Sequence, residues 1–328
     1  MAGGGRLGFI GRRLVKAVFV VLGIVVLSFL LVRLAPGDPA LIMAGEAGAA
    51  DEKFVADLRR EFGLDRPLWV QLYLYMGDVL RLDLGYSYRQ KADVLDLILD
   101  RVPQTILLTG VAVVFAIVVG MTLGALAARH VGTWRDSLIT VLALVVYATP
   151  SFWLGLMLVL LFSVQLGWLP AFGMETIQAR YTGLARALDV GRHLILPALT
   201  LGLFFTAVYA RLTRASMLEV AGMDFVKTGR AKGLSEGKVV RRHILRNALL
   251  PVVTYAGIQA GYLIGGSILI ETVFAWPGIG RLAFEAVLVR DYNLLLGVFI
   301  VASVLVIAFN LITDIVYTLV DPRIELAS

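Results

Sequence analysis

The sequence predicts an all-α, polytopic membrane protein with six transmembrane helices. Hydrophobic residues make up 59% of the 328 residues and charged residues only 16%, whereas soluble domains average about 45–50% and about 25%. The apolar residues also gather in six long runs, at residues 17–32, 106–128, 140–166, 194–210, 249–273 and 294–320. This composition excludes an ordinary soluble enzyme and an intrinsically disordered chain.

Each run is close to or above the roughly 17–20 residues that a helix needs to cross a bilayer. None of the runs alternates as barrel strands do, so each is predicted to be helical. The first is the shortest, and Leu14 and Val15 extend it if Lys16 snorkels. A signal peptide is the alternative there, but the run is long for one and no small-x-small cleavage site follows. Pro150 and Pro197 predict kinks in helices three and four.

Basic residues set the predicted orientation. If both termini are cytoplasmic, the inner segments carry 16 Lys and Arg residues and the two short outer loops carry 5, as the positive-inside rule requires. We therefore expect three parts: residues 1–34 with the first helix, an extracytoplasmic helical subdomain at 35–103, and a core at 104–328 containing helices two to six. The basic pI reflects this topology and predicts no nucleic-acid partner.

The outer segment at 35–103 has its own helical pattern. Phe54, Leu58 and Phe62 repeat at helical spacing before Gly63, and a second apolar pattern follows Pro67. A small folded subdomain over the outer face is the favoured interpretation. A pair of interfacial helices resting on lipid headgroups is the alternative.

The inner loop at residues 211–247, here called the basic loop, is too long to be a simple connection. It holds nine basic and three acidic residues, and Gly233 is expected to end a short helix. A solvated, lipid-attracted loop would explain the charge. A surface that docks a soluble partner explains both the charge and the predicted helix-glycine-helix.

Residues 224–251 carry the sequence that identifies a family. They read Asp-Phe-Val-Lys-Thr-Gly-Arg-Ala-Lys-Gly-Leu and later Arg-His-Ile-Leu-Arg-Asn-Ala-Leu-Leu-Pro. This stretch resembles the cytoplasmic loop of ABC-importer permeases of the dipeptide, oligopeptide and nickel class, with Gly229 in place of the usual alanine. Further family landmarks follow in order, at residues 34–39, 62–67, 83–87, 101–105, 271–280 and 321–323.

The resemblance implies the fold of a type I, MetI-like permease in the bacterial inner membrane, translocating di- or oligopeptides. Nickel chelates, glutathione, opines and haem are the other substrates of the class. The implied partners are a second homologous permease forming a heterodimer, two ABC ATPase subunits or domains that bind ATP and Mg²⁺, an extracytoplasmic substrate-binding protein, and lipid. The residues implied to dock on the ATPase are Asp224, Phe225, Lys227, Thr228, Gly229, Arg230, Ala231, Lys232, Gly233 and Leu234.

The chain itself is expected to have no catalytic residue, metal site or cofactor. Its one Gly-Lys pair, at 237–238, lacks the glycine spacing and the hydroxyl residue of a phosphate-binding loop. There is no cysteine, and the three histidines are far apart in sequence. An ion-coupled secondary transporter is a weaker alternative because few charges lie deep in the apolar runs, and an intramembrane hydrolase is weaker still.

Small and polar residues inside the runs are the remaining candidates. Glycines spaced four apart predict close helix packing, at Gly120, Gly124, Gly257, Gly261 and Gly265. Gln259, Asn310 and Asp314 are the deepest polar residues of the last two helices, and Asn310 and Asp314 share a helix face. They are predicted to line the translocation path or to join helices.

Overall fold

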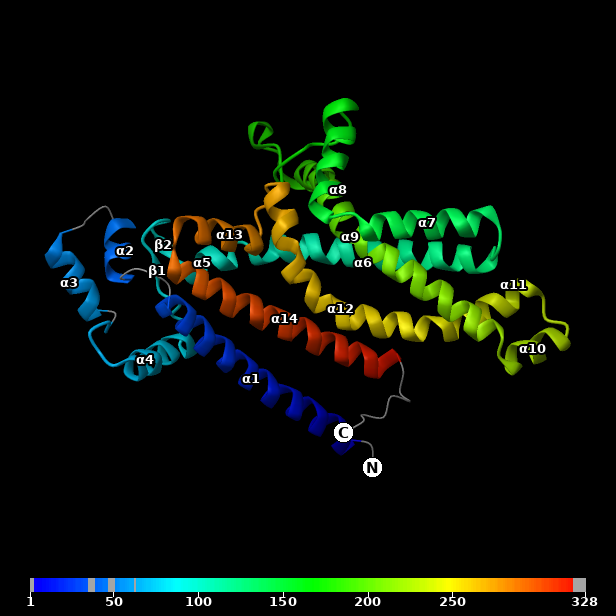
Figure 1. Ribbon diagram of the computed structural model, residues 1–328, viewed down its shortest axis with the longest axis horizontal. Helices are drawn as coiled ribbons and strands as arrows, with labels where there is room; N and C mark the ends of the chain where they lie inside the picture. Colours follow the sequence, from blue (N-terminus) through cyan, green and yellow to red (C-terminus); the bar gives the residue numbers. More distant parts are fainter. Residues whose placement is uncertain (1–2, 35–38, 47–50, 62, 321–328) are drawn as a thin grey trace. The chain divides into compact units, whose positions relative to one another are not determined.

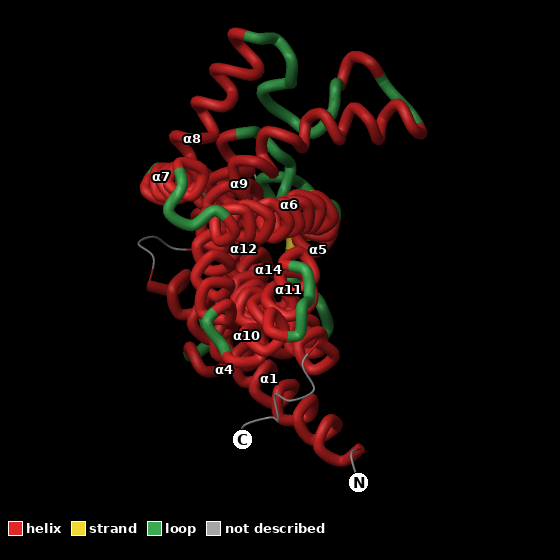
Figure 2. Tube along the Cα trace, turned by 90° about the vertical axis from the view of Figure 1, so that its right-hand side faces the viewer, coloured by secondary structure: helices red, strands yellow, loops and turns green. Residues whose placement is uncertain are grey.

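The computed structural model describes residues 3–34, 39–46, 51–61 and 63–320. Within these residues the chain is helical apart from its loops and one short antiparallel hairpin (Figure 2), so the predicted mostly helical fold is confirmed. In chain order the elements are α1 (Gly3–Leu34), α2 (Pro39–Glu46), α3 (Glu52–Glu61), α4 (Leu68–Leu80), β1 (Tyr86–Ser87), β2 (Ala92–Asp93), α5 (Val94–Leu99), α6 (Val102–Arg129), α7 (Trp134–Ala148), α8 (Ser151–Leu158), the π-helical turn η1 (Val159–Gln165), the 3₁₀ turn η2 (Ile177–Ala179), α9 (Gly183–Ala221), α10 (Asp224–Ala231), α11 (Glu236–Val239), the π-helical turn η3 (Val240–Leu245), α12 (Arg246–Val273), α13 (Ile279–Val289) and α14 (Tyr292–Val320).

Several of these helices have the length and hydropathy of membrane spans. Among the described residues, three qualify: Val94–Arg129, Gly183–Ala221 and Tyr292–Leu311. The bent pair α7 and α8–η1 would make a fourth. In α1 the apolar stretch is shorter, Val15–Leu30. The structure therefore holds at least three candidate spans, and the full set of six stays a prediction.

The third apolar run is broken at Pro150. Its two halves, α7 and α8–η1, meet at 108°, and Figure 1 shows them leaving the junction in different directions. Proline lacks the N–H of a helical bond and pushes the preceding residue into extended conformation; Thr149 accordingly has φ −85° and ψ 130°. The sequence predicted a kink here, and the structure has a sharp break. At Pro197, by contrast, α9 continues through the proline.

The chain forms two compact units, Met1–Gln104 with Gly278–Ala308, and Thr105–Pro277 with Phe309–Ser328. The core of the first unit joins α1, α5, α13 and α14 through side chains such as Val25, Ile98 and Leu282. At Gly297 of α14, an added Cβ would lie only 3.1 Å from Ile98 Cδ1. Glycine at this position therefore lets α14 lie directly against α5.

In the first unit, the β1–β2 hairpin is tied to the start of α14. The Ser87 hydroxyl donates to Asp291 Oδ2 over 2.5 Å, and Asn293 Nδ2 donates to the Tyr86 carbonyl over 3.1 Å. Asp291 also accepts the Leu294 N–H through Oδ1 at 3.1 Å. Ser87 and Asp291 are both buried. Ser87 is thus anchored to a residue 204 positions away in the sequence.

The second unit is organised around α9, the longest helix described, which packs against α7, α8 and α12. Its core also takes in α6 and η1, with Leu108, Leu196, Ile270, Phe274 and Trp276 among the buried side chains. The end of α9 leads into α10, and α12 begins just after η3 (Figure 1). The basic loop is therefore attached at both ends to long helices that pack on each other.

Candidate functional site

The residues predicted to dock a partner, Asp224–Leu234, form α10 and the turn after it. Met223 precedes α10 in extended conformation, and the helix ends at Ala231. Asp224 lies in its first turn and Arg230 in its last, where their charges complement the helix dipole. Lys227 Nζ pairs with Asp224 Oδ1 at 2.9 Å. The short helix expected before Gly233 is present.

One face of α10 is buried against the neighbouring helices. Val226 is fully buried in a cluster with Met217 and Val220 of α9 and with Ile244 and Ala248, which belong to η3 and α12. Gly229 is buried on the same face, and an added Cβ would lie 3.7 Å from Leu234 Cδ1, an ordinary contact. The short helix is therefore held by apolar packing, and the alanine usual in the family would fit.

The turn after α10 depends on Gly233. Its φ is +79°, in the left-handed region that side chains with a Cβ disfavour. Its N–H donates to the Arg230 carbonyl at 2.9 Å, and Leu234 N–H donates to the Gly229 carbonyl at 3.3 Å. These bonds satisfy carbonyls at the helix end, as glycine C-caps do. The expected turn and the expected glycine cap are the same feature.

An ion pair closes this turn from outside. Arg230 Nη2 and Nε donate to Glu236 Oε1 at 2.7 Å and Oε2 at 3.1 Å. The Arg230 guanidinium holds the pKa of Glu236 below its ordinary value by this hydrogen bonding. Glu236 was not among the predicted site residues, although an acid shortly after a basic helix end is a recognisable signal.

The outward face of α10 and of the turn after it is accessible and carries more basic than acidic side chains. Gly229 is buried and Leu234 half-buried, whereas the other predicted docking residues are exposed: Asp224, Phe225, Lys227, Thr228, Arg230, Ala231, Lys232 and Gly233. Helix α10 is therefore held by packing on one face and accessible on the other.

Another ion pair near the same end of α9 was missed at the sequence level. The Arg214 guanidinium on α9 donates two hydrogen bonds to the Asp136 carboxylate on α7, from Nε to Oδ1 at 2.6 Å and from Nη2 to Oδ2 at 2.8 Å. Gly132 N–H also donates to Asp136 at 3.2 Å. Paired bonds of this kind fix geometry as well as charge. An isolated acid at the start of an apolar run was the available signal.

The structure describes only some of the small and polar residues predicted to lie within the membrane. Asn310 is exposed on α14. The side chains of Gln259 and Asp314, and the surroundings of Gly257, Gly261 and Gly265, lie outside the described residues. The role expected for the three polar residues therefore stays a prediction. Gly120 and Gly124 of α6 lie against α9, where an added Cβ at Gly120 would be 2.6 Å from Tyr209 Cβ.

A buried carboxylate for which the sequence predicted no partner lies in α12. Glu271 is fully buried and its Oε1 accepts hydrogen bonds from the Thr105 hydroxyl of α6 at 2.8 Å and the Ser267 hydroxyl at 3.0 Å. Buried carboxylates require such partners. The contact joins two helices whose residues are 166 positions apart, so local sequence carries no signal for it.

We expect Thr105→Val to weaken the α6–α12 contact. Valine keeps the shape but removes a donor to a buried acceptor, which costs about 1–3 kcal/mol. The measurement is the melting temperature of the purified assembly in detergent. Thr105→Ser, which keeps the hydroxyl, is the control and should melt close to the wild type. Equal melting temperatures of the valine and serine variants would show that this hydrogen bond does not stabilise the assembly.

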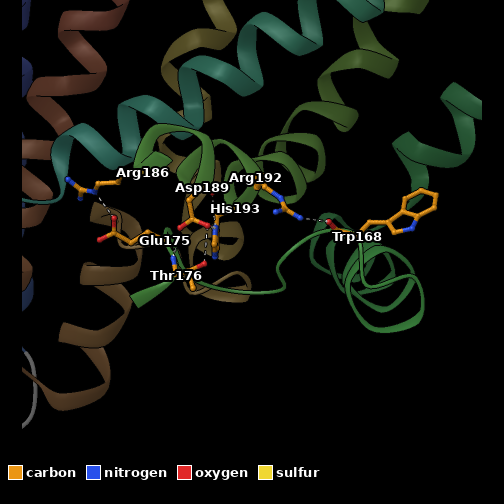
Figure 3. A network of polar contacts seen from close by, with 7 residues as sticks. All are labelled: Trp168, Glu175, Thr176, Arg186, Asp189, Arg192 and His193. Carbon is orange, nitrogen blue, oxygen red and sulfur yellow. Dashed lines mark hydrogen bonds and ion pairs between the residues drawn. The ribbon is translucent and has the colours of Figure 1, made fainter. Parts of the chain in front are cut away.

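Polar contacts fix the loop before α9 (Figure 3). Thr176 donates to Asp189 through its N–H at 2.6 Å and its hydroxyl at 2.9 Å. Arg186 pairs with Glu175 at 2.6 Å. His193 Nδ1 lies 2.9 Å from the Asp189 carbonyl oxygen. The bonds of Thr176 and Glu175 hold the loop on the first turns of α9, and these residues line an open pocket of about 470 Å³.

Family models match most of the chain. The model described as the binding-protein-dependent transport system inner membrane component matches residues 120–326. The model for the N-terminal part of the binding-protein-dependent transport system membrane component matches residues 6–109. Together they include α10 and the helices on which it is held.

Similar proteins are found in several bacteria. The chain is 40% identical to the dipeptide transport system permease of Alkalihalophilus pseudofirmus and 39% identical to the oligopeptide transport system permease of Bacillus subtilis. It is also 40% identical to the glutathione transport system permease of Escherichia coli O6:H1. Each alignment covers 97% of this chain and 99% of the relative.

The fold is also found in a solved structure. The inward-facing MetNI methionine ABC transporter contains a chain that matches with a TM-score of 0.55 at 19% identity. The match covers 69% of this chain and 96% of that chain. At this identity the likeness establishes the fold alone.

Proposed function

The chain belongs to the binding-protein-dependent transport system inner membrane component family, and from that premise we propose that it translocates di- or oligopeptides. It is a multi-pass permease subunit of an ABC importer in the bacterial inner membrane, and ATP is hydrolysed on a separate subunit. The observation that carries the substrate class is the identity of about 40%, over nearly the whole chain, to permeases named for dipeptide and oligopeptide transport.

Membership of the family implies an ATPase and a substrate-binding protein as partners. We propose further that a second, homologous permease completes the path, that two ATPase subunits or domains serve the pair, and that the binding protein docks from outside. The charge asymmetry of the loops supports both termini being cytoplasmic. Five of the six apolar runs fall within single helices, α1, α6, α9, α12 and α14, and the third is divided between α7 and α8–η1. This arrangement supports six spans.

We propose that α10 is the element that contacts the ATPase. Its exposed face offers Phe225 and Lys227, Lys232 follows at its end, and its buried face packs through Val226 on α9 and α12. A movement of α10 caused by a partner on its exposed face would be passed directly to α9 and α12, because packed cores resist deformation. An ATP-driven change between two arrangements of the helices requires that the ATPase contact α10 differently in the two arrangements.

Reconstitution tests the function. The chain is assembled with its companion permease, ATPase and substrate-binding protein in proteoliposomes, and uptake of labelled di- and tripeptides is measured with and without ATP. We expect uptake that needs ATP, the binding protein and the companion permease together. Uptake by this chain alone, driven by an ion gradient, would refute the proposal. A functional assembly with only two copies of this chain would refute the heterodimer.

Glutathione is a second candidate substrate, favoured by the 40% identity to a glutathione permease over the same share of the chain. The same proteoliposomes distinguish it. Uptake of labelled glutathione that unlabelled dipeptides fail to inhibit would assign the chain to glutathione.

A further inference from the structure

In the first unit, helix α4 presents two different faces. Gln71, Tyr75 and Val79, spaced four apart, are buried or half-buried, and Tyr75, Met76 and Val79 pack on the core that includes α1. On the other face, Trp69 is 74% exposed, Tyr73 77% and Leu80 79%. Residues at these spacings share one side of a helix. The exposed face is therefore apolar and aromatic, the reverse of a water-facing helix.

The orientation of α4 is fixed from the buried side. The Gln71 side-chain amide donates to the carbonyls of Leu64 at 3.2 Å and Arg66 at 2.7 Å, which ties the helix to the loop before it. The Tyr75 ring lies 5.8 Å from the Phe29 ring of α1, and burial raises the pKa of the Tyr75 hydroxyl. Trp69 and Tyr73 are thus exposed because the contacts of the buried side fix the orientation of α4.

The contact with α1 places α4 at one end of the apolar stretch of that helix. The apolar stretch of α1 is Val15–Leu30, about 24 Å long at the helical rise of 1.5 Å per residue. Phe29, which touches Tyr75, lies next to the end of that stretch, far from Lys16 at its start. A helix held there lies near the boundary between acyl chains and headgroups. Leu27 and Leu30, near the same end of α1, are also exposed.

The chemistry of the exposed face suits that boundary. Tryptophan and tyrosine concentrate at membrane interfaces, because their rings are apolar and their N–H or O–H groups need polar partners. Arg66 precedes α4 in the sequence and Arg81 follows it. Both side chains are exposed and can pair with lipid phosphates. Helix α3 in the same unit is rich in charge, Glu-Lys-Phe-Val-Ala-Asp-Leu-Arg-Arg-Glu, and is suited to water.

We propose that Trp69, Tyr73 and Leu80 of α4 form a lipid-binding surface inserted at the headgroup–acyl boundary of the outer leaflet. The outer segment is then divided between a water-facing part around α3 and an interfacial helix, α4. A soluble docking partner fits less well, because it would leave a Trp, a Tyr and a Leu in water whenever it departed.

The absence of cysteine from the chain permits a direct depth measurement. Single cysteines are introduced as Trp69→Cys and Tyr73→Cys and labelled with a nitroxide. The labelled chain is assembled with cysteine-free companion subunits in nanodiscs of phosphatidylethanolamine and phosphatidylglycerol. Collision rates with oxygen, which partitions into lipid, and with a water-soluble nickel chelate are then measured. Asp57→Cys on α3 and Asp78→Cys, on the other side of α4 from Trp69, are matched controls.

At positions 69 and 73 we expect oxygen collisions to exceed nickel collisions several-fold, with the ratio reversed at 57 and 78. Nickel collisions at 69 and 73 equal to those at 57 would overturn the proposal in favour of a water-facing helix. Low collisions with both reagents and an immobilised label would overturn it in favour of a protein partner. If the Trp69→Cys or the Tyr73→Cys chain fails to co-purify with the companion subunits, Leu80→Cys replaces that variant. The measurement needs no transport, so it remains readable even if no peptide is taken up.

Discussion

Gly233→Val is expected to lower peptide uptake about 5–30-fold while the ATPase subunits continue to hydrolyse ATP. Gly233 has φ +79°, and a residue with a Cβ in that region costs roughly 1–2 kcal/mol, which corresponds to a factor of about 5–30 in a population. No atom lies within 4 Å of the added Cβ, so the strain is in the backbone. It is relieved by turning α10, and a displaced α10 would no longer pass the ATPase movement to α9 and α12.

The readout is the ratio of peptide taken up to ATP hydrolysed in proteoliposomes. Gly237→Val is the matched control, since Gly237 lies in α11, has no positive φ and has open space around it. It should leave the ratio unchanged because valine is a better helix former than glycine. If both variants lose uptake equally, the left-handed turn is irrelevant. If neither does, α10 is not the coupling element.

Gly124→Val is expected to remove most of the correctly assembled protein. An added Cβ at Gly124 would overlap the Ala210 carbonyl oxygen and lie 2.7 Å from Thr213 Cβ, both on α9. Backbone cannot rotate away as a side chain can, so α6 and α9 must separate. Overpacking costs typically about 1–3 kcal/mol, and small residues are what allow membrane helices to approach this closely.

Size-exclusion profiles and melting temperatures of the detergent-solubilised assembly measure this effect. Gly110→Val on the same helix is the control, because no atom lies within 4 Å of the added Cβ there. We expect the control to elute and melt like the wild type and Gly124→Val to aggregate or to melt several degrees lower. Equal behaviour of the two variants would show that the α6–α9 contact tolerates separation.

The helices and the family could be predicted from the sequence because their signals are local. Six apolar runs, the glycine at 233 and the ordered motifs need no knowledge of distant residues. Pro150 was recognised as a point of weakness, but its effect was underestimated, because the angle between α7 and α8 depends on what each half packs against. The small hairpin at Tyr86–Asp93 was not predicted, since two-residue strands have no periodicity.

Hydropathy along the chain determined by itself that this protein is a helical membrane protein. The ordered motifs indicated the permease family, and the side of the membrane on which the basic loop lies is a prediction from the charges. Tertiary structure alone decided which groups meet: Glu271 with Thr105, Ser87 with Asp291, and Arg214 with Asp136. The physical reason is range. Transfer of a segment into lipid depends on that segment's own composition, whereas a buried hydrogen bond or a glycine contact exists only when two distant helices are held together by everything else packed around them.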